Sequence, residues 1–138
     1  MRNLLLSTAM IVGLAGTASA ETVGVSMALF DDNFLTVLRN GIQDIAKGMD
    51  GVDVQIEDAQ NDVAKQLDQI NNFIASGVDA IIVNPVDTSA TQAMSDAAAA
   101  ANIPLVYVNR EPINVDTLPD NQAFVASNEV DSGTLETI

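Results

Sequence analysis

Apolar residues form five short runs along the chain, and each run has the length and composition of a β-strand. TVGVSMALF (22–30) is apolar and partly β-branched, which is typical of a strand buried on both faces. VDVQIED (52–58) alternates apolar and polar residues, which predicts a second strand. The other three runs are VDAIIVN (78–84), PLVYVN (104–109) and AFVAS (123–127).

Between these runs, apolar residues recur at steps of three and four, which is the period of an amphipathic helix. A first helix over 34–49 has one apolar stripe, formed by Leu35, Leu38, Ile42, Ile45 and Met49. A second helix has Asp62 as its cap and Gly77 as its stop. A third spans about 88–101 and contains five consecutive alanines, and a last helix opens at 131–133.

Strands that alternate with helices of this length form a parallel sheet covered on both faces. The fold class that we predict is therefore α/β, a doubly wound parallel sheet with the flavodoxin-like strand order 2-1-3-4-5. The last predicted helix has barely begun at Ile138, so its apolar face is incomplete. We expect the protein to continue beyond this residue.

Polar side chains follow the strands at the edge of the sheet where ligands bind in this fold. In open doubly wound sheets, ligands lie outside the carboxyl ends of the strands, at the switch point, which lies between strands 1 and 3 in this order. Strand 1 ends in FDDNF (30–34) and strand 3 ends in NPVDT (84–88). Strand 4 brings Asn109-Arg110-Glu111 beside them. We expect these segments to share one crevice.

The side chains of this crevice suit hydroxyl groups. A carboxylate such as Asp32 accepts two adjacent O–H donors, the amide of Asn84 both donates and accepts, and Arg110 offers a planar fork of donors. Phe34 adds an apolar face against which the C–H side of a sugar ring can lie. The set favours a neutral polyol over an anion.

Each of these residues also has a purely structural interpretation. Asp32 or Asn33 can cap the first helix, Asp87 can cap the third, and Asn84 before a proline fits a turn. Phe34 lies about 60° from the axis of the apolar stripe, counting 100° per residue, so it is also a candidate core residue. Arg110 has a glutamate as its neighbour and can pair with it. Only the convergence of these residues at one switch point favours a binding site.

The chain contains no cysteine and no histidine, which removes the commonest catalytic bases and metal ligands. Ser-His-Asp, Cys-His and zinc sites are therefore excluded within this sequence. The acidic pair after strand 1 is compatible with a magnesium-binding receiver domain, but AFVASN stands where that class needs a lysine. Gly24 stands alone without the GxGxxG of a dinucleotide site. We predict no cofactor and no enzymatic reaction.

The first 20 residues have the layout of a secretory signal peptide. A lone Arg2 precedes an apolar core, and Ala18-Ser19-Ala20 form a cleavage site before Glu21. After removal of residues 1–20, four basic residues stand against nineteen acidic ones. Such a surface repels nucleic acid and anionic lipids. We expect an exported protein with no nucleic-acid partner.

Several segments together resemble a known family. They are FDDNF (30–34), DAQNDVAKQLDQI (58–70), VDAIIVNPVDTSA (78–90), NIPLVYVNREP (102–112) and VASNEVDSG (125–133). In this order they resemble the type I periplasmic sugar-binding proteins of bacterial ABC transporters, most closely the galactose/glucose-binding type and its rhizopine- and inositol-binding relatives.

The resemblance implies a two-lobed receptor that closes on a monosaccharide or cyclitol, of which residues 21–138 are the N-terminal lobe, truncated before the second. It implies that Asp32 holds sugar hydroxyls, Phe34 stacks on the ring and Asn84 hydrogen-bonds it. Arg110 stands where the galactose type has lysine, whereas ribose-type relatives use an arginine nearby to bind the sugar, so Arg110 is also an expected ligand contact. Ala28 stands where that type has an aromatic residue. The implied partner is a membrane permease, in the periplasm.

Two other classes share this fold. A ligand-sensing lobe for a chemoreceptor or a sensor kinase fits the same residues and is compatible with transport. Sugar-responsive repressors use the same lobe for their effector, but they have an N-terminal helix-turn-helix where this chain has a signal peptide.

Overall fold

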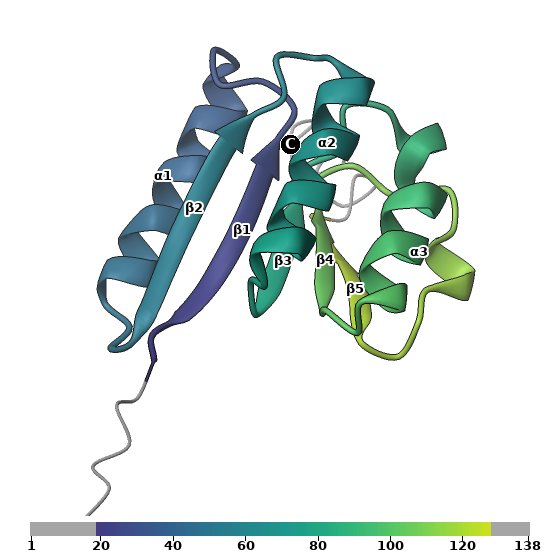
Figure 1. Cartoon of the computed structure of the whole chain (residues 1–138). Helices are drawn as coiled ribbons and strands as arrows, with labels where there is room; N and C mark the ends of the chain where they lie inside the picture. The colour runs from purple at the N-terminus through teal and green to yellow at the C-terminus, as the bar shows by residue number, and fades with distance from the viewer. Residues whose placement is uncertain (1–18, 128–138) are drawn as a thin grey trace, which may run out of the picture.

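A computed structural model describes residues 19–127, which form one five-stranded parallel sheet with the order β2-β1-β3-β4-β5. This confirms the predicted fold class and strand order. Figure 1 shows α1 behind the sheet and α2 and α3 in front of it. Most of the predicted signal peptide (1–18) and the predicted helix from Asp131 lie outside the described residues.

The strands and helices lie close to the predicted ranges. The strands are β1 (Glu21–Met27), β2 (Val52–Asp58), β3 (Ala80–Val83), β4 (Leu105–Val108) and β5 (Gln122–Val125). The helices are α1 (Asn33–Lys47), α2 (Val63–Ser76) and α3 (Thr91–Ala100), with short 3-10 turns η1 (Thr88–Ala90) and η2 (Val115–Thr117).

Two of the boundaries that differ from the prediction lie beside a side-chain contact with the backbone. β1 ends at Met27, not at residue 30, and the N–H of the next residue, Ala28, faces the side chain of Asn84, 3.4 Å away. The third helix begins with η1, where Asp87 accepts a hydrogen bond from the Ser89 N–H (2.8 Å). Asp87 is thus a cap, as the structural interpretation of that residue predicted. Asp62 caps α2 and Gly77 ends it in the left-handed conformation, which confirms both signals.

The two faces of the sheet have separate apolar clusters. α2 and α3 pack on β3 and β4 around Ile70, Phe73 and Tyr107, whereas α1 packs on β1 and β2 around Leu35. At Gly24 an added Cβ would lie 2.6 Å from the Phe73 ring. α2 therefore lies directly against the backbone of β1.

The apolar stripe of α1 is buried only at its N-terminal end. Leu35 is 3% exposed, whereas Ile45 and Met49 are more than half exposed. α1 packs mainly on the edge strand β2, so its C-terminal turns reach past the covered area and flank a hollow with Val54 and Ile82. Within residues 19–127, no helix combines the length and apolarity that a membrane crossing needs.

Candidate functional site

The loop between β1 and α1 presents a carboxylate and an aromatic ring at the carboxyl edge of the sheet. Asp32 is the N-cap of α1, and its Oδ1 accepts a hydrogen bond from the Leu35 N–H (2.9 Å). Asp32 is exposed, and its Oδ2 has no hydrogen-bond partner among residues 19–127. Phe34 is 58% exposed, which rules out its interpretation as a core residue. One oxygen and one ring face are thus available to a ligand.

Asn84 follows β3 and is fully buried. Its side chain faces the Ala28 N–H (3.4 Å) and the Val108 carbonyl (3.3 Å), so it lies between the ends of β1 and β4. Both distances are long for hydrogen bonds. The structure gives this amide a structural task, and its predicted contact with a ligand stays a prediction.

A buried set of polar side chains fixes the strand ends from the α2 side. Gln66 Nε2 donates to Ser26 Oγ and to the Asn84 carbonyl (both 3.0 Å), and Gln66 Oε1 accepts from the Val86 N–H (2.8 Å). Ser26 in turn donates to Gln69 (2.7 Å). Buried amides with every partner satisfied hold a single geometry. The sequence prediction missed this set.

Arg110 holds the end of β4 against the segment that follows β3. Its Nη1 donates to the carbonyls of Pro85 (2.7 Å) and Val86 (3.1 Å). Among residues 19–127 it makes no ion pair with Glu111, which was the alternative interpretation. The other nitrogens of its guanidinium make no hydrogen bond within the described chain, so the fork still has donors for a ligand.

Asn109 is a residue that the sequence prediction placed in the crevice but did not select as a ligand contact. Its φ is +69°, and the Arg110 N–H donates to the Val108 carbonyl (2.8 Å) across it, closing a tight three-residue turn. Strained backbone of this kind clusters at binding sites. Asparagine tolerates positive φ better than most residues, which was the available signal.

A hollow of about 300 Å³ brings Phe34 and Asn109 together. The rest of its lining is formed by Leu38, Val108, Val125, Ala126 and Ser127. The hollow thus joins the N-terminus of α1 to the ends of β4 and β5. The lining is mostly apolar, with the amide of Asn109 and the hydroxyl of Ser127 as its polar side chains, and this composition suits the C–H face of a small polyol.

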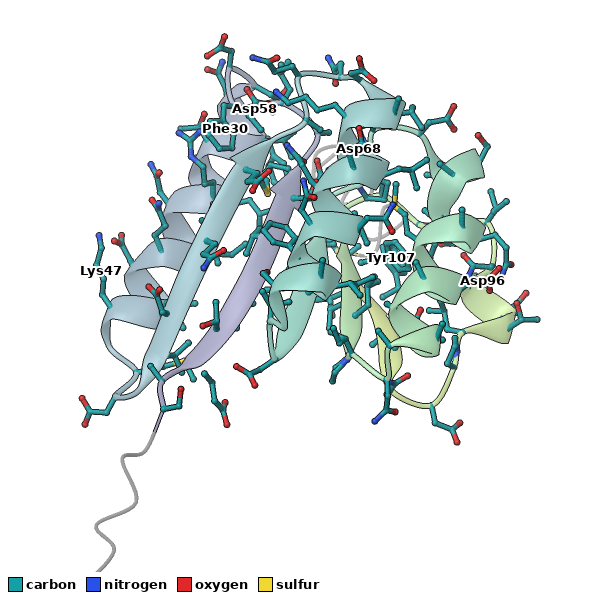
Figure 2. The ribbon with its side chains drawn as sticks, in the orientation of Figure 1. Phe30, Lys47, Asp58, Asp68, Asp96 and Tyr107 are labelled. Carbon is teal, nitrogen blue, oxygen red and sulfur yellow. The ribbon has the colours of Figure 1, made fainter. Side chains whose placement is uncertain are left out.

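The loop that follows β4 is fastened to α3 by a second buried polar set. Tyr107 OH donates to the Thr91 carbonyl (2.7 Å) and lies 2.8 Å from Ser95 Oγ, while Asn114 Nδ2 donates to Ser95 Oγ (2.9 Å). Figure 2 shows Tyr107 between β4 and α3. Burial raises the pKa of Tyr107 to about 12. This set supports the loop that carries Arg110.

Asp87, in the segment that follows β3, also has a shifted pKa. Hydrogen bonds from Ser89, first its backbone N–H, hold the pKa of Asp87 below its ordinary value. Within residues 19–127, no group of three or more carboxylates is arranged to hold a metal ion. The side chains at this edge of the sheet offer hydrogen bonds from Asp32 and Arg110 and the ring face of Phe34.

Comparison with known proteins gives one family. The model of the periplasmic binding protein domain matches residues 23–136. A Rhizobium meliloti protein named "Putative rhizopine-binding protein" is 67% identical over 137 residues, covering 99% of this chain and 44% of that protein. The ribose import binding protein of Bacillus subtilis is 36% identical, covering 88% of this chain and 38% of that protein.

Solved structures of periplasmic binding proteins are also similar to this chain. An ABC transporter solute binding protein from Bacillus halodurans with bound myo-inositol has a TM-score of 0.75 and 32% identity, covering 88% of this chain and 44% of that one. The arabinose-binding component from Shewanella sp. ANA-3 has a TM-score of 0.72 and 32% identity, covering 81% of this chain and 36% of that one. The chain spans less than half the length of these relatives. Since the family model covers most of its residues, the chain belongs to the periplasmic binding protein family.

Proposed function

We propose that this chain is the N-terminal lobe of the substrate-binding component of an ABC importer, and that it binds a monosaccharide or a cyclitol. The ligand lies at the carboxyl edge of the sheet, against Phe34. Asp32 accepts ligand hydroxyls, and Arg110 and Asn109 hydrogen-bond the opposite side. Asn84 acts mainly through the loops that it holds, because its side chain is fully buried between the ends of β1 and β4.

The observation that carries this proposal is the hollow shared by Phe34 and Asn109, with Asp32 two residues before the ring. Phe34 and Val125 are both more than half exposed and line the same hollow, and apolar side chains exposed together are a feature of ligand-binding grooves. The unpaired oxygen of Asp32 adds an acceptor beside that ring. An apolar face with adjacent acceptors is the arrangement that recognises a sugar or cyclitol ring.

The relatives support the chemical class of the ligand. Their names and structures refer to rhizopine, ribose, arabinose and myo-inositol, all of which carry several hydroxyl groups on a small skeleton. The relatives are binding proteins, and we propose binding without chemistry for this chain as well. We further propose export to the periplasm through residues 1–20, and docking of the closed, ligand-bound protein on a membrane permease.

The test is a thermal-shift screen of the complete protein purified from its native source. The ligands are hexoses, pentoses, inositols and amino derivatives of inositols. A ligand at about 100 times its dissociation constant adds roughly 2.7 kcal/mol of stability. A shift from one sugar or cyclitol supports the proposal and identifies the ligand. Absence of any shift across the set would contradict it.

A second measurement separates the lobe from the complete protein. We expect residues 21–138 alone to bind the same ligand weakly, because closure of a second lobe supplies many contacts and excludes water. Isothermal calorimetry checks this. Micromolar or tighter binding by residues 21–138 would show that one lobe is sufficient.

A further inference from the structure

We propose that Arg39 is a positioning residue for the ligand loop 28–32. Its guanidinium lies over the ring of Phe30 and holds this loop in the conformation that presents Asp32. The proposal rests on the proposed function of Asp32 for its effect on ligand affinity. Its structural part, the fixing of the loop, does not depend on any ligand.

The contact between Arg39 and Phe30 has the geometry of a cation–π interaction. The central carbon of the guanidinium lies 4.2 Å from the centroid of the ring, within the range over which such pairs attract. Both side chains are half-buried, which limits screening by water. Figure 2 shows Phe30 beside α1, at the edge of the sheet toward which the strands point.

Arg39 contacts an aromatic ring although the chain is rich in carboxylates. The sequence has nineteen acidic residues and five basic ones. Within residues 19–127, the ion pair that forms is Lys47 with Asp44, and Arg39 pairs with no carboxylate. Its guanidinium is directed instead at an aromatic ring in the loop that precedes its own helix.

Three hydrogen bonds fasten the same loop to the first turns of α1. Thr36 Oγ1 donates to the Phe30 carbonyl (2.8 Å) and the Thr36 N–H to the Asp32 carbonyl (2.9 Å). The Leu35 N–H donates to Asp32 Oδ1 (2.9 Å). Thr36 and Arg39 are three residues apart and therefore share one flank of α1. Phe30 is thus held on that flank through both its carbonyl and its ring.

The two aromatic rings at this edge have different surroundings. Phe30 lies under a cation and is half-buried, whereas Phe34 is 58% exposed in the hollow with Asn109. We assign Phe30 to fixing the loop and Phe34 to meeting the ligand. Without the charge of Arg39, Phe30 keeps its carbonyl bond but loses the attraction on its ring. The loop then opens more often, and Asp32 loses its fixed position.

Amide hydrogen exchange in the complete protein, measured by NMR, tests whether Arg39 fixes the loop. In Arg39→Met, which keeps an aliphatic stem but no charge, we expect the Leu35 N–H to exchange about threefold to thirtyfold faster. Phe30→Leu should have a similar effect, and the double variant should be no faster than either single one. The conservative variants Arg39→Lys and Phe30→Tyr should keep the exchange of the Leu35 N–H as slow as in the wild type. Lys47→Met, which removes a charge farther along α1, is the matched control and should leave Leu35 unchanged.

Unchanged exchange at Leu35 in Arg39→Met would overturn the proposal. An equal acceleration along all of α1 would also overturn it, because that result would indicate general loss of helix stability. In the complete protein, Arg39→Met should raise the dissociation constant of the ligand by about threefold to thirtyfold. If the loop is loosened but the affinity is unchanged, the positioning role is wrong. If the wild type binds no sugar or cyclitol, the proposed function fails, and the exchange data still decide whether Arg39 fixes the loop.

Discussion

Replacement of Gly24 by alanine tests how closely α2 packs on β1. The new Cβ would lie 2.6, 2.7 and 2.8 Å from three atoms of the Phe73 ring. Carbon atoms in contact prefer 3.5–4.0 Å, so the ring has to retreat by about 1 Å. Phe73 is 2% exposed and has little free space around it. Overpacking of this kind costs about 1–3 kcal/mol.

The displacement would reach the candidate site. Phe73 lies in α2, which also carries Gln66 and Gln69, and these amides hold the ends of β1 and β3. We therefore expect the loss of stability in Gly24→Ala to be near the upper end of that range. In a domain of this size, a loss of about 3 kcal/mol corresponds to a melting temperature lower by roughly 9–15 °C.

Urea unfolding followed by circular dichroism measures the effect, and Gly41→Ala is the matched control. Gly41 lies within α1, and no atom lies within 4 Å of its added Cβ. Alanine there should raise the free energy of unfolding by about 0.5–1 kcal/mol, because alanine is the better helix former. A Gly24→Ala protein as stable as the wild type would refute the close packing of α2 on β1.

Three further predictions concern the buried polar groups and the site. The pKa of Tyr107 is about 12 in the folded chain against 10.0 for the free side chain. The contribution of this shift to the free energy of unfolding is therefore complete below pH 10 and is lost between pH 10 and 12, roughly 2–3 kcal/mol in all. Phenolate absorbance of this single tyrosine measures the pKa, and Tyr107→Phe should show no such loss of stability. Gln66→Leu leaves the Val86 N–H without its partner and should lower the free energy of unfolding by about 2–4 kcal/mol, whereas Gln55→Leu on the exposed side of β2 should be near neutral in the same urea titration. Asn109→Gly suits the positive φ and should keep the melting temperature while raising the dissociation constant of the ligand by about tenfold.

The arrangement of strands and helices could be predicted from the sequence because the spacing at which apolar residues recur is a local signal. The caps at Asp62 and Asp87 and the stop at Gly77 confirm that signals at helix ends are equally local. The shortening of β1 could not be predicted in this way. The apolar run continues to Phe30, and the side chain that faces the Ala28 N–H belongs to Asn84, 56 residues away.

The candidate site was only partly predictable for the same reason. The fold class predicts that ligands bind at the carboxyl ends of the strands, but the hollow at this edge lies between α1, β4 and β5 and contains only Phe34 of the four predicted contact residues. The distinction between Asn84 and Asn109 depends on burial, since the first amide faces the backbone of β1 and β4 and the second lies in the hollow with Phe34. Gln66 and Gln69 look like surface residues in the sequence. Their positions between the apolar residues of α2 were the signal that they are buried.

The measurement that tests the central claim most directly is ligand binding by Asp32→Ser in the complete protein. Serine keeps the N-cap of α1, so the melting temperature without ligand should stay close to that of the wild type. Loss of the carboxylate leaves ligand hydroxyls unpaired and should cost about 2–4 kcal/mol, a dissociation constant roughly 30-fold to 1,000-fold higher in calorimetry. A dissociation constant within tenfold of the wild type would mean that Asp32 is only a cap, and that the ligand is bound elsewhere.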